Sequence, residues 1–353
     1  MRQSVPTPTL RWLALACTPG ARTLEPPPTG WFQLLDLAER HRIGGLLWRR
    51  LAPQSASIPS SVAAGLKAQA QAITAANLRA ALECQRVAAA FTDAGLPFLF
   101  LKGLALSWLA YGDSTVKMSR DIDLLVLPSA VAKAAECLGK LGYEPQVPGR
   151  VASVPDWHRR SKESVWVEAG GTIVELHSRL NDNPRLMAQV TAITSARLVE
   201  VAPGIRLPTL QPPELLAYLA VHGASSAWFR LKWLADFANL LRKQPAEFDQ
   251  VYGSMLALGC DRAGGLALLL ARRVFDVEVP PKLTAKLEAD RAIGWLAGEA
   301  TRQMAAAVEP TRRPLGTIGI HLSQLFIESG WACSIVAGQR LVMDVAARRL
   351  FRE

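Results

Sequence analysis

Acidic residues in the middle of the chain have the types and spacing of ligands for a divalent cation. Asp121 and Asp123 alternate with apolar residues in RDIDLLVLP, which predicts a strand that presents both carboxylates on one face. Two carboxylates so close together repel each other, and a bound Mg²⁺ would relieve that repulsion. Glu175, in TIVELH, is the expected third carboxylate of a site that also accepts phosphate oxygens as ligands. His177 shares a face with Glu175, and we expect it to position a phosphate, to hydrogen-bond a ligating carboxylate, or to be satisfied within the fold.

A lysine and a glycine upstream supply the opposite charge. PFLFLKG is a short apolar run that predicts a buried strand, and a helix is expected over residues 104–111, so Lys102 and Gly103 lie between the two. The N-terminus of a helix favours an anion, Gly103 would let a phosphate approach the backbone, and Lys102 would neutralise it. Arg120, beside the carboxylates, is expected to bind or steer the same substrate. Each motif alone also fits a solvated surface, and only their order along the chain indicates a site for phosphates.

The elements that must position these residues form a helical segment, a mixed core and a second helical segment. Periodicity predicts a helix over residues 31–51, broken at Gly44-Gly45, and a long helix over residues 62–94. SVWVEA and TIVELH, separated by Gly170-Gly171, predict a β-hairpin. Further elements are expected as a helix at 129–141, a short strand near 205–207, and helices at 213–222, 226–242, 246–258 and 261–275.

These patterns predict an α+β fold with a small mixed sheet, preceded by helices and followed by an all-helical domain. The expected boundaries are 1–75 for the N-terminal helical region, 76–210 for the core that carries the site, and 211–353 for the C-terminal helical domain. A length of 353 residues, half of them hydrophobic, is enough for two or three domains.

Composition limits the compartment and the partners. The net charge of +10 favours anionic partners such as nucleotides, nucleic acid or acidic lipid. Five scattered cysteines form no CxxC motif, which indicates reduced thiols. No apolar run is long enough to span a bilayer, and the N-terminal segment is a poor secretory signal, so a cytoplasmic protein without membrane contact is expected. The sequence also lacks the G-x-x-x-x-G-K-[ST] pattern of a P-loop enzyme.

LKGLALSWLAYGDSTVKMSRDIDLLV resembles the signature of a family of uncharacterised bacterial nucleotidyltransferases within the DNA-polymerase-beta-like superfamily. VELHS downstream, PELLAYLAVHG, WFRLKWLADFANLL and the earlier FQLLDLAERHRIGGLL are similar to other parts of that family, so the resemblance covers roughly residues 30–245. The matching residues of the signature are Leu101, Lys102, Gly103, Tyr111, Arg120, Asp121, Asp123, Leu124, Leu125 and Val126.

The resemblance implies a nucleotidyltransferase palm in which Asp121, Asp123 and Glu175 bind Mg²⁺, with Mn²⁺ as an alternative. The implied reaction transfers a nucleoside monophosphate from a nucleoside triphosphate such as ATP to an acceptor hydroxyl, releasing pyrophosphate. Lys232 is assigned to nucleotide binding on the resemblance alone. The wider superfamily carries a Gly-Ser pair where this chain has Lys102-Gly103, so a serine contact to phosphate is absent.

Three alternatives remain open for the acceptor and for turnover. The protein could modify RNA as a toxin-like enzyme, could modify a peptide or small metabolite, or could be a non-catalytic nucleotide- or peptide-binding module on the same fold. The sequence does not predict the base, the acceptor or the oligomeric state.

Overall fold

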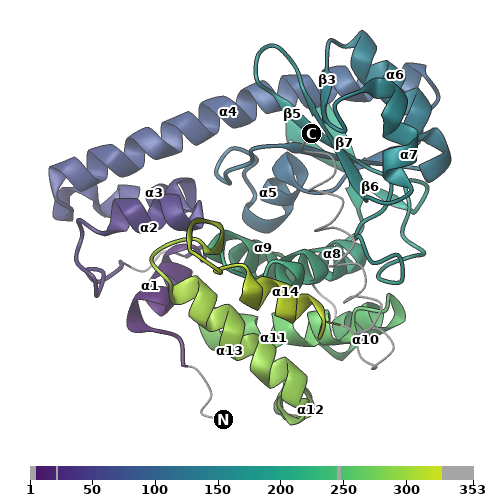
Figure 1. The fold of residues 1–353 in the computed structure, drawn as a ribbon. Coiled ribbons are helices and arrows are strands. Elements are labelled where there is room, and N and C mark those ends of the chain that lie inside the picture. The colour runs from purple at the N-terminus through teal and green to yellow at the C-terminus, as the bar shows by residue number, and fades with distance from the viewer. Residues whose placement is uncertain (1–4, 21–22, 245–247, 328–353) are drawn as a thin grey trace. The chain divides into compact units, whose positions relative to one another are not determined.

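A computed structural model of the chain describes residues 5–20, 23–244 and 248–327. Within these residues it contains fourteen α-helices and a seven-stranded mixed sheet, with helices before and after the strands (Figure 1). The α+β class predicted from the sequence is therefore confirmed. None of the helices in the described ranges is both long and apolar enough to cross a membrane.

The described residues divide into two compact units. One contains residues 16–215, with every strand of the sheet, and the other contains residues 5–15 and 216–327. The boundary falls within α8 (Pro212–Ser225). The division of the chain at 75/76 and 210/211 stays a prediction.

The sheet has the strand order β3-β4-β5-β2-β1-β7-β6. Its strands are β1 (Phe98–Phe100), β2 (Ile122–Val126), β3 (Glu144–Val147), β4 (Glu163–Val167), β5 (Ile173–His177), β6 (Ala196–Ala202) and β7 (Ile205–Leu210). β4 and β5 form the predicted antiparallel hairpin, while β2 pairs in parallel with β5 and antiparallel with β1. The strands expected around Phe98, Ile122 and Ile205 are confirmed, whereas β3 and β6 are additional to the prediction.

Period-two alternation gives the central strands two different faces. One face is apolar and is covered by α4 (Ser60–Asp93) and α6 (Val131–Lys140). Its core includes Val87, Phe91, Leu124, Val126, Ala134, Leu138, Trp166, Val174 and Leu176. The opposite face of β2 and β5 carries Asp123, Glu175 and His177. A well-packed layer therefore fixes the backbone that holds these polar side chains.

The other helices of the strand-containing unit are α2 (Leu34–His41), α3 (Gly44–Leu51), α5 (Gly103–Tyr111) and α7 (Val154–His158). The second unit contains α9 (Leu231–Arg242), α10 (Phe248–Ala257), α11 (Asp261–Phe275), α12 (Pro281–Ala289), α13 (Arg291–Ala305) and α14 (Ile318–Gln324). α1 (Pro8–Ala16) lies mostly in that unit. The long predicted helix is confirmed as α4, which Figure 1 shows extending well beyond the sheet.

The break predicted at Gly44-Gly45 lies two residues earlier. α2 ends at His41, Arg42 adopts a left-handed conformation with φ of 56°, and Gly44 begins α3. The two glycines serve close packing instead. A Cβ at Gly44 would lie 2.3 Å from Gln69 Oε1, and one at Gly45 would lie 2.2 Å from a backbone carbonyl oxygen. The sequence signal for a helix break was therefore a signal for close approach between segments.

Candidate metal and phosphate site

Strand register brings the acidic residues of the polar face together. Asp123 on β2 is directly opposite Glu175 on the parallel strand β5. His177 is two residues further along β5 and shares the face of Glu175, as predicted. Glu163, the first residue of β4, is directly opposite His177 across the hairpin. Side chains opposite each other on one face of a sheet lie close enough to interact.

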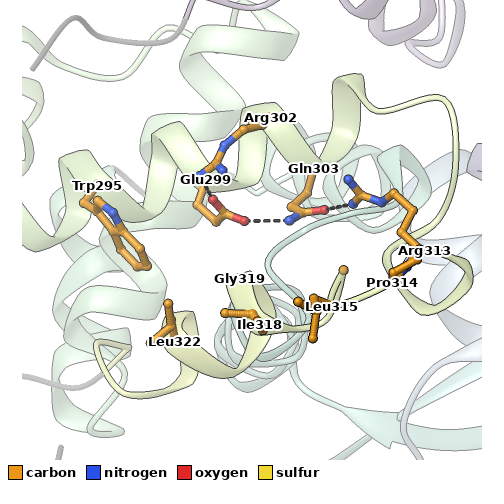
Figure 2. Close-up of a pocket in the computed structure, with 11 residues that line it drawn as sticks. Trp295, Glu299, Arg302, Gln303, Arg313, Pro314, Leu315, Ile318, Gly319 and Leu322 are labelled. Carbon is orange, nitrogen blue, oxygen red and sulfur yellow. Dashed lines mark hydrogen bonds and ion pairs between the residues drawn. The ribbon is translucent and has the colours of Figure 1, made fainter.

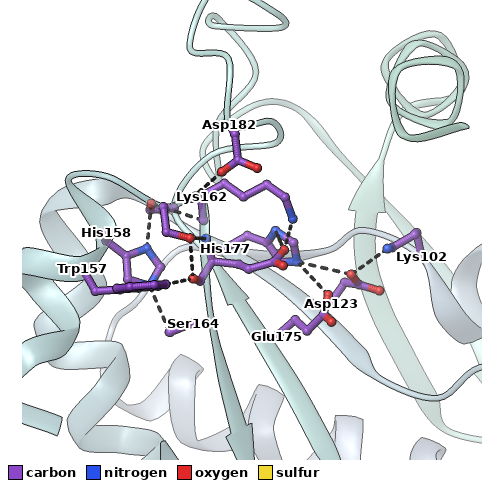
Figure 3. Close-up of polar contacts among 12 residues, drawn as sticks. Lys102, Asp123, Trp157, His158, Lys162, Ser164, Glu175, His177 and Asp182 are labelled. Carbon is purple, nitrogen blue, oxygen red and sulfur yellow. Dashed lines mark hydrogen bonds and ion pairs between the residues drawn. The ribbon is translucent and has the colours of Figure 1, made fainter. Parts of the chain in front are cut away.

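The three side chains of Asp123, Glu175 and His177 each offer one ligand atom, and these atoms lie within 4.8 Å of one another. His177 Nε2 lies 3.2 Å from Asp123 Oδ1 and 3.6 Å from Glu175 Oε2. Figure 3 shows the ring of His177 between these carboxylates, with Lys102 on the far side of Asp123. His177 and Asp123 are almost fully buried, while the Glu175 side chain is 23% exposed. One ligand therefore faces solvent and two are fixed inside the protein.

Lys102 forms an ion pair with Asp123, the more buried of the two clustered carboxylates. Its Nζ lies 2.8 Å from Asp123 Oδ1. Burial alone would raise the pKa of Asp123, but the Lys102 ammonium and the hydrogen bond with His177 outweigh it and hold that pKa well below its ordinary value of 3.8. Asp123 is therefore a carboxylate anion over the physiological pH range.

The backbone around Lys102 has the form expected for a phosphate site. Lys102 directly precedes α5, and Gly103, the first residue of the helix, has φ of +64°. An L-residue rarely adopts that angle, so glycine is required for conformation. Apart from its chain neighbours and its own helix backbone, the one described atom within 4 Å of a Cβ at Gly103 would be Ser119 Oγ, at 3.8 Å, so space is left beside the helix N-terminus. The strand–lysine–glycine–helix arrangement predicted from the sequence is present.

The donor set fits a divalent cation. Asp123 Oδ2 is buried and makes no hydrogen bond with any described residue. A bound cation would provide this oxygen with a partner. Adjacent ligands of an octahedral Mg²⁺ lie about 3.0 Å apart, given metal–oxygen distances near 2.1 Å. The observed separations of 3.2 and 3.6 Å need only small shifts to reach that value. Two carboxylates and one imidazole are a set that also suits Mn²⁺.

Two side chains that the sequence did not single out as ligands complete the cluster. Glu163 Oε2 lies 3.4 Å from His177 Nδ1 and also contacts Lys162 Nζ. Lys162 lies in a polar stretch directly before β4, yet its side chain is only 24% exposed and faces the carboxylates (Figure 3). Burial lowers the pKa of Lys162, although the carboxylate of Asp182 opposes that shift. The sequence did contain a signal for Glu163. Counting back along both strands from the hairpin turn at residues 168–171 places Glu163 opposite His177.

Other predicted residues lie outside the three-ligand group. Asp121 lies in a bend directly before β2, is half-buried and is not among the three clustered ligands in the described ranges. Arg120 next to it is exposed. Lys232 is buried on α9, in the second compact unit. The assignments of these three residues to metal or nucleotide stay predictions.

A second polar cluster surrounds His158, at the end of α7. Its Nδ1 lies 2.8 Å from Ser178 Oγ, and its Nε2 lies 2.9 Å from Ser164 Oγ. Trp166 Nε1 also donates to Ser164 Oγ, at 2.9 Å. Burial, together with electrostatic repulsion from His177 and Arg179, lowers the pKa of His158 to about 4. His158 is therefore a neutral, fully hydrogen-bonded side chain at pH 7.

The second unit contains a hollow of about 370 Å³ beside α13 (Figure 2). The carboxylate of Glu299, 2% exposed, accepts hydrogen bonds from Arg302 and from Gln303 Nε2, and Gln303 Oε1 accepts one from Arg313. The polar groups of this hollow thus pair with one another. None of the site residues predicted from the sequence lines it.

The fold and the side chains define an α+β protein with a candidate divalent-metal site next to a lysine at a helix N-terminus. The chain belongs to the family described as uncharacterised nucleotidyltransferase, whose model matches residues 27–276. That span includes the whole sheet and every residue of the cluster. No curated protein matches the chain significantly.

Proposed function

We propose that the protein is a metal-dependent nucleotidyltransferase of the DNA-polymerase-beta-like superfamily. It transfers a nucleoside monophosphate from a nucleoside triphosphate to an acceptor hydroxyl, with release of pyrophosphate. The observation that carries the proposal is the group of Asp123, Glu175 and His177 within 4.8 Å, in a chain of the nucleotidyltransferase family. Mg²⁺ or Mn²⁺, when bound, supplies positive charge to orient the triphosphate and to stabilise charge that develops on the α-phosphate.

The residues of the chain have separate tasks in this reaction. Asp123 and Glu175, joined by His177, hold the cation, and we assign Asp121 as a further ligand from the bend before β2. Lys102 and the first backbone N–H groups of α5 bind phosphate oxygens, and Gly103 leaves room for them. Catalysis then rests on positioning and electrostatic stabilisation.

The acceptor hydroxyl loses its proton as it attacks the α-phosphate in line. Glu175 is the base that this geometry favours, because its side chain is partly exposed while Asp123 is buried and paired with Lys102. The bond between the α-phosphate and its bridging oxygen breaks, and the pair of electrons leaves with pyrophosphate. Arg120 is assigned to nucleotide binding from its place beside the carboxylates, and Lys232 from the family resemblance alone.

The test compares two positions of radioactive phosphorus in the substrate. The protein is incubated with Mg²⁺ or Mn²⁺, fractionated cell extract, and each ribonucleoside triphosphate labelled at the α- or the γ-phosphate. Nucleotidyl transfer predicts that α-label joins a macromolecule or metabolite while γ-label leaves as pyrophosphate, and that Asp123→Asn abolishes labelling. Transfer of γ-label would indicate a kinase and would contradict the proposal, as would equal α-labelling by Asp123→Asn.

A further inference from the structure

Glu163 approaches the metal cluster from the side of His177 that faces away from the other ligands. It begins β4 and is directly opposite His177 across the hairpin. Its Oε2 lies 3.4 Å from His177 Nδ1, while the other ring nitrogen, Nε2, lies between Asp123 and Glu175. The imidazole thus separates Glu163 from the two ligating carboxylates.

The two nitrogens of a neutral imidazole have different roles, because one carries the proton and the other carries the free lone pair. In metal sites the second nitrogen of a ligating histidine usually donates its N–H to a carboxylate or carbonyl, which fixes the tautomer and the ring orientation. The buried Nδ1 of His177 makes no hydrogen bond within the described part of the chain. Glu163 Oε2 is near enough to accept that N–H after a small shift.

We propose that Glu163 is a positioning residue that accepts the Nδ1–H of His177 and thereby presents the Nε2 lone pair to the metal held by Asp123 and Glu175. The inference rests on the proposed metal-dependent function, but it concerns the ligand set alone. Lys162 Nζ contacts the same oxygen of Glu163 and holds it beside His177. An imidazole among the ligands favours Mn²⁺ over Mg²⁺, which prefers oxygen.

Metal affinity tests the hydrogen bond separately from turnover. Mn²⁺ alone is titrated into the full-length protein, and free Mn²⁺ is measured by its electron paramagnetic resonance signal. Glu163→Ala removes the acceptor and should weaken Mn²⁺ binding by about 10–100-fold. Glu163→Gln keeps an acceptor oxygen and should retain most of the affinity. Glu144→Gln, at an exposed acid on the neighbouring strand β3, is the matched control and should bind like the wild type.

Equal losses in Glu163→Gln and Glu163→Ala would show that the charge of Glu163 acts, and would overturn the proposal. Unchanged affinity in Glu163→Ala, confirmed as folded by circular dichroism, would overturn it too. So would a wild type that binds no Mn²⁺.

A second readout needs no substitution at Glu163. Pulsed electron paramagnetic resonance of the Mn²⁺-loaded wild type should show coupling to an imidazole nitrogen, and His177→Gln should lose it. Mn²⁺ bound without nitrogen coupling would refute the role of Glu163 while leaving nucleotidyl transfer intact. Conversely, nitrogen coupling with the expected affinities, but without transfer of α-label, would support the ligand set and refute the proposed reaction.

Discussion

Two buried histidines, His158 at the end of α7 and His177 at the end of β5, show how differently buried polar side chains are used. His158 has both ring nitrogens hydrogen-bonded to serine hydroxyls. His177 lies among three carboxylates, and its Nδ1 makes no hydrogen bond in the described ranges. A satisfied neutral network stabilises a fold, whereas a charged cluster with orphaned atoms is costly unless a ligand completes it. The comparison supports a structural role for His158 and the role that we propose for His177.

The largest expected effect is on the rate of nucleotidyl transfer, which should depend on the Asp123 cluster and not on the His158 cluster. Asp123→Asn removes the charge of a buried ligand and should reduce nucleotidyl transfer by about 10³-fold, or ~4 kcal/mol. His158→Gln should change the same rate by less than about tenfold, or ~1.4 kcal/mol. Initial rates of α-label incorporation, on variants shown to be folded, provide the measurement. Similar losses in both variants would remove the distinction between the clusters.

The next largest effect is on how the free energy of unfolding depends on pH, which should differ between the His158 and Asp123 clusters. The pKa of His158 is about 4 in the folded protein, against 6.5 for an ordinary histidine. Below pH 6.5 the histidine is therefore protonated in the unfolded state, whereas in the native state it is protonated only below about pH 4. That difference lowers the free energy of unfolding by about 3 kcal/mol as pH falls through this window. Asp123 does not contribute in this pH window. Its pKa is lowered in the folded protein, so the stability that its ionised form provides is lost only as pH falls below 3.8.

His158→Gln removes this titration, so urea unfolding between pH 7 and pH 4 should show a weaker loss of stability than in the wild type. The variant should also be less stable at pH 7, because the two serine hydroxyls lose well-placed partners. If both proteins showed the same pH dependence, His158 would not be the neutral histidine that the comparison with His177 requires.

The smallest effect concerns Gly103, which follows the lysine of the charged cluster. Gly103→Ala should reduce the free energy of unfolding by about 1–2 kcal/mol, because a left-handed angle is unfavourable for alanine. Gly103→Asn should cost less, since asparagine tolerates this conformation. The nearest described atom to a new Cβ is 3.8 Å away, so the loss would come from conformation and not from a clash. Urea unfolding measures both variants, and a stable alanine variant would contradict the geometry.

The fold of the central strands was predictable from the sequence because each strand has one buried face. Alternation in residues 122–126 and 173–177 marked β2 and β5, and the glycine pair between the hairpin strands marked their turn. β3 and β6 were missed because they lie at the two edges of the sheet. β3 is mostly exposed and contains Pro145, a residue that is common in edge strands, so it lacks the pattern of a buried strand.

The candidate site was predictable to the extent that chemistry and local spacing define it. Asp123, Glu175 and Lys102 could be selected from motifs, and the structure brings these three together. Glu163 and Lys162 could not be selected in this way, because their place depends on the register of β4 against β5 and on burial of the loop before β4. Residue type alone does not distinguish a surface Lys-Glu pair from one that faces a metal site.

The central claim is that the Asp123 cluster binds a nucleoside triphosphate through a divalent cation. The most direct test is thermal unfolding of wild type and Asp123→Asn with each triphosphate, with and without Mg²⁺ or Mn²⁺. At a ligand concentration one hundred times its Kd, the free energy of unfolding should rise by about 2.7 kcal/mol. Because each 1 kcal/mol raises Tm by about 2–4 °C in a unit of roughly 200 residues, Tm should rise by roughly 5–10 °C. We predict a metal-dependent rise with at least one triphosphate that Asp123→Asn loses. No rise with any triphosphate at millimolar concentration, or an equal rise in the variant, would contradict the account.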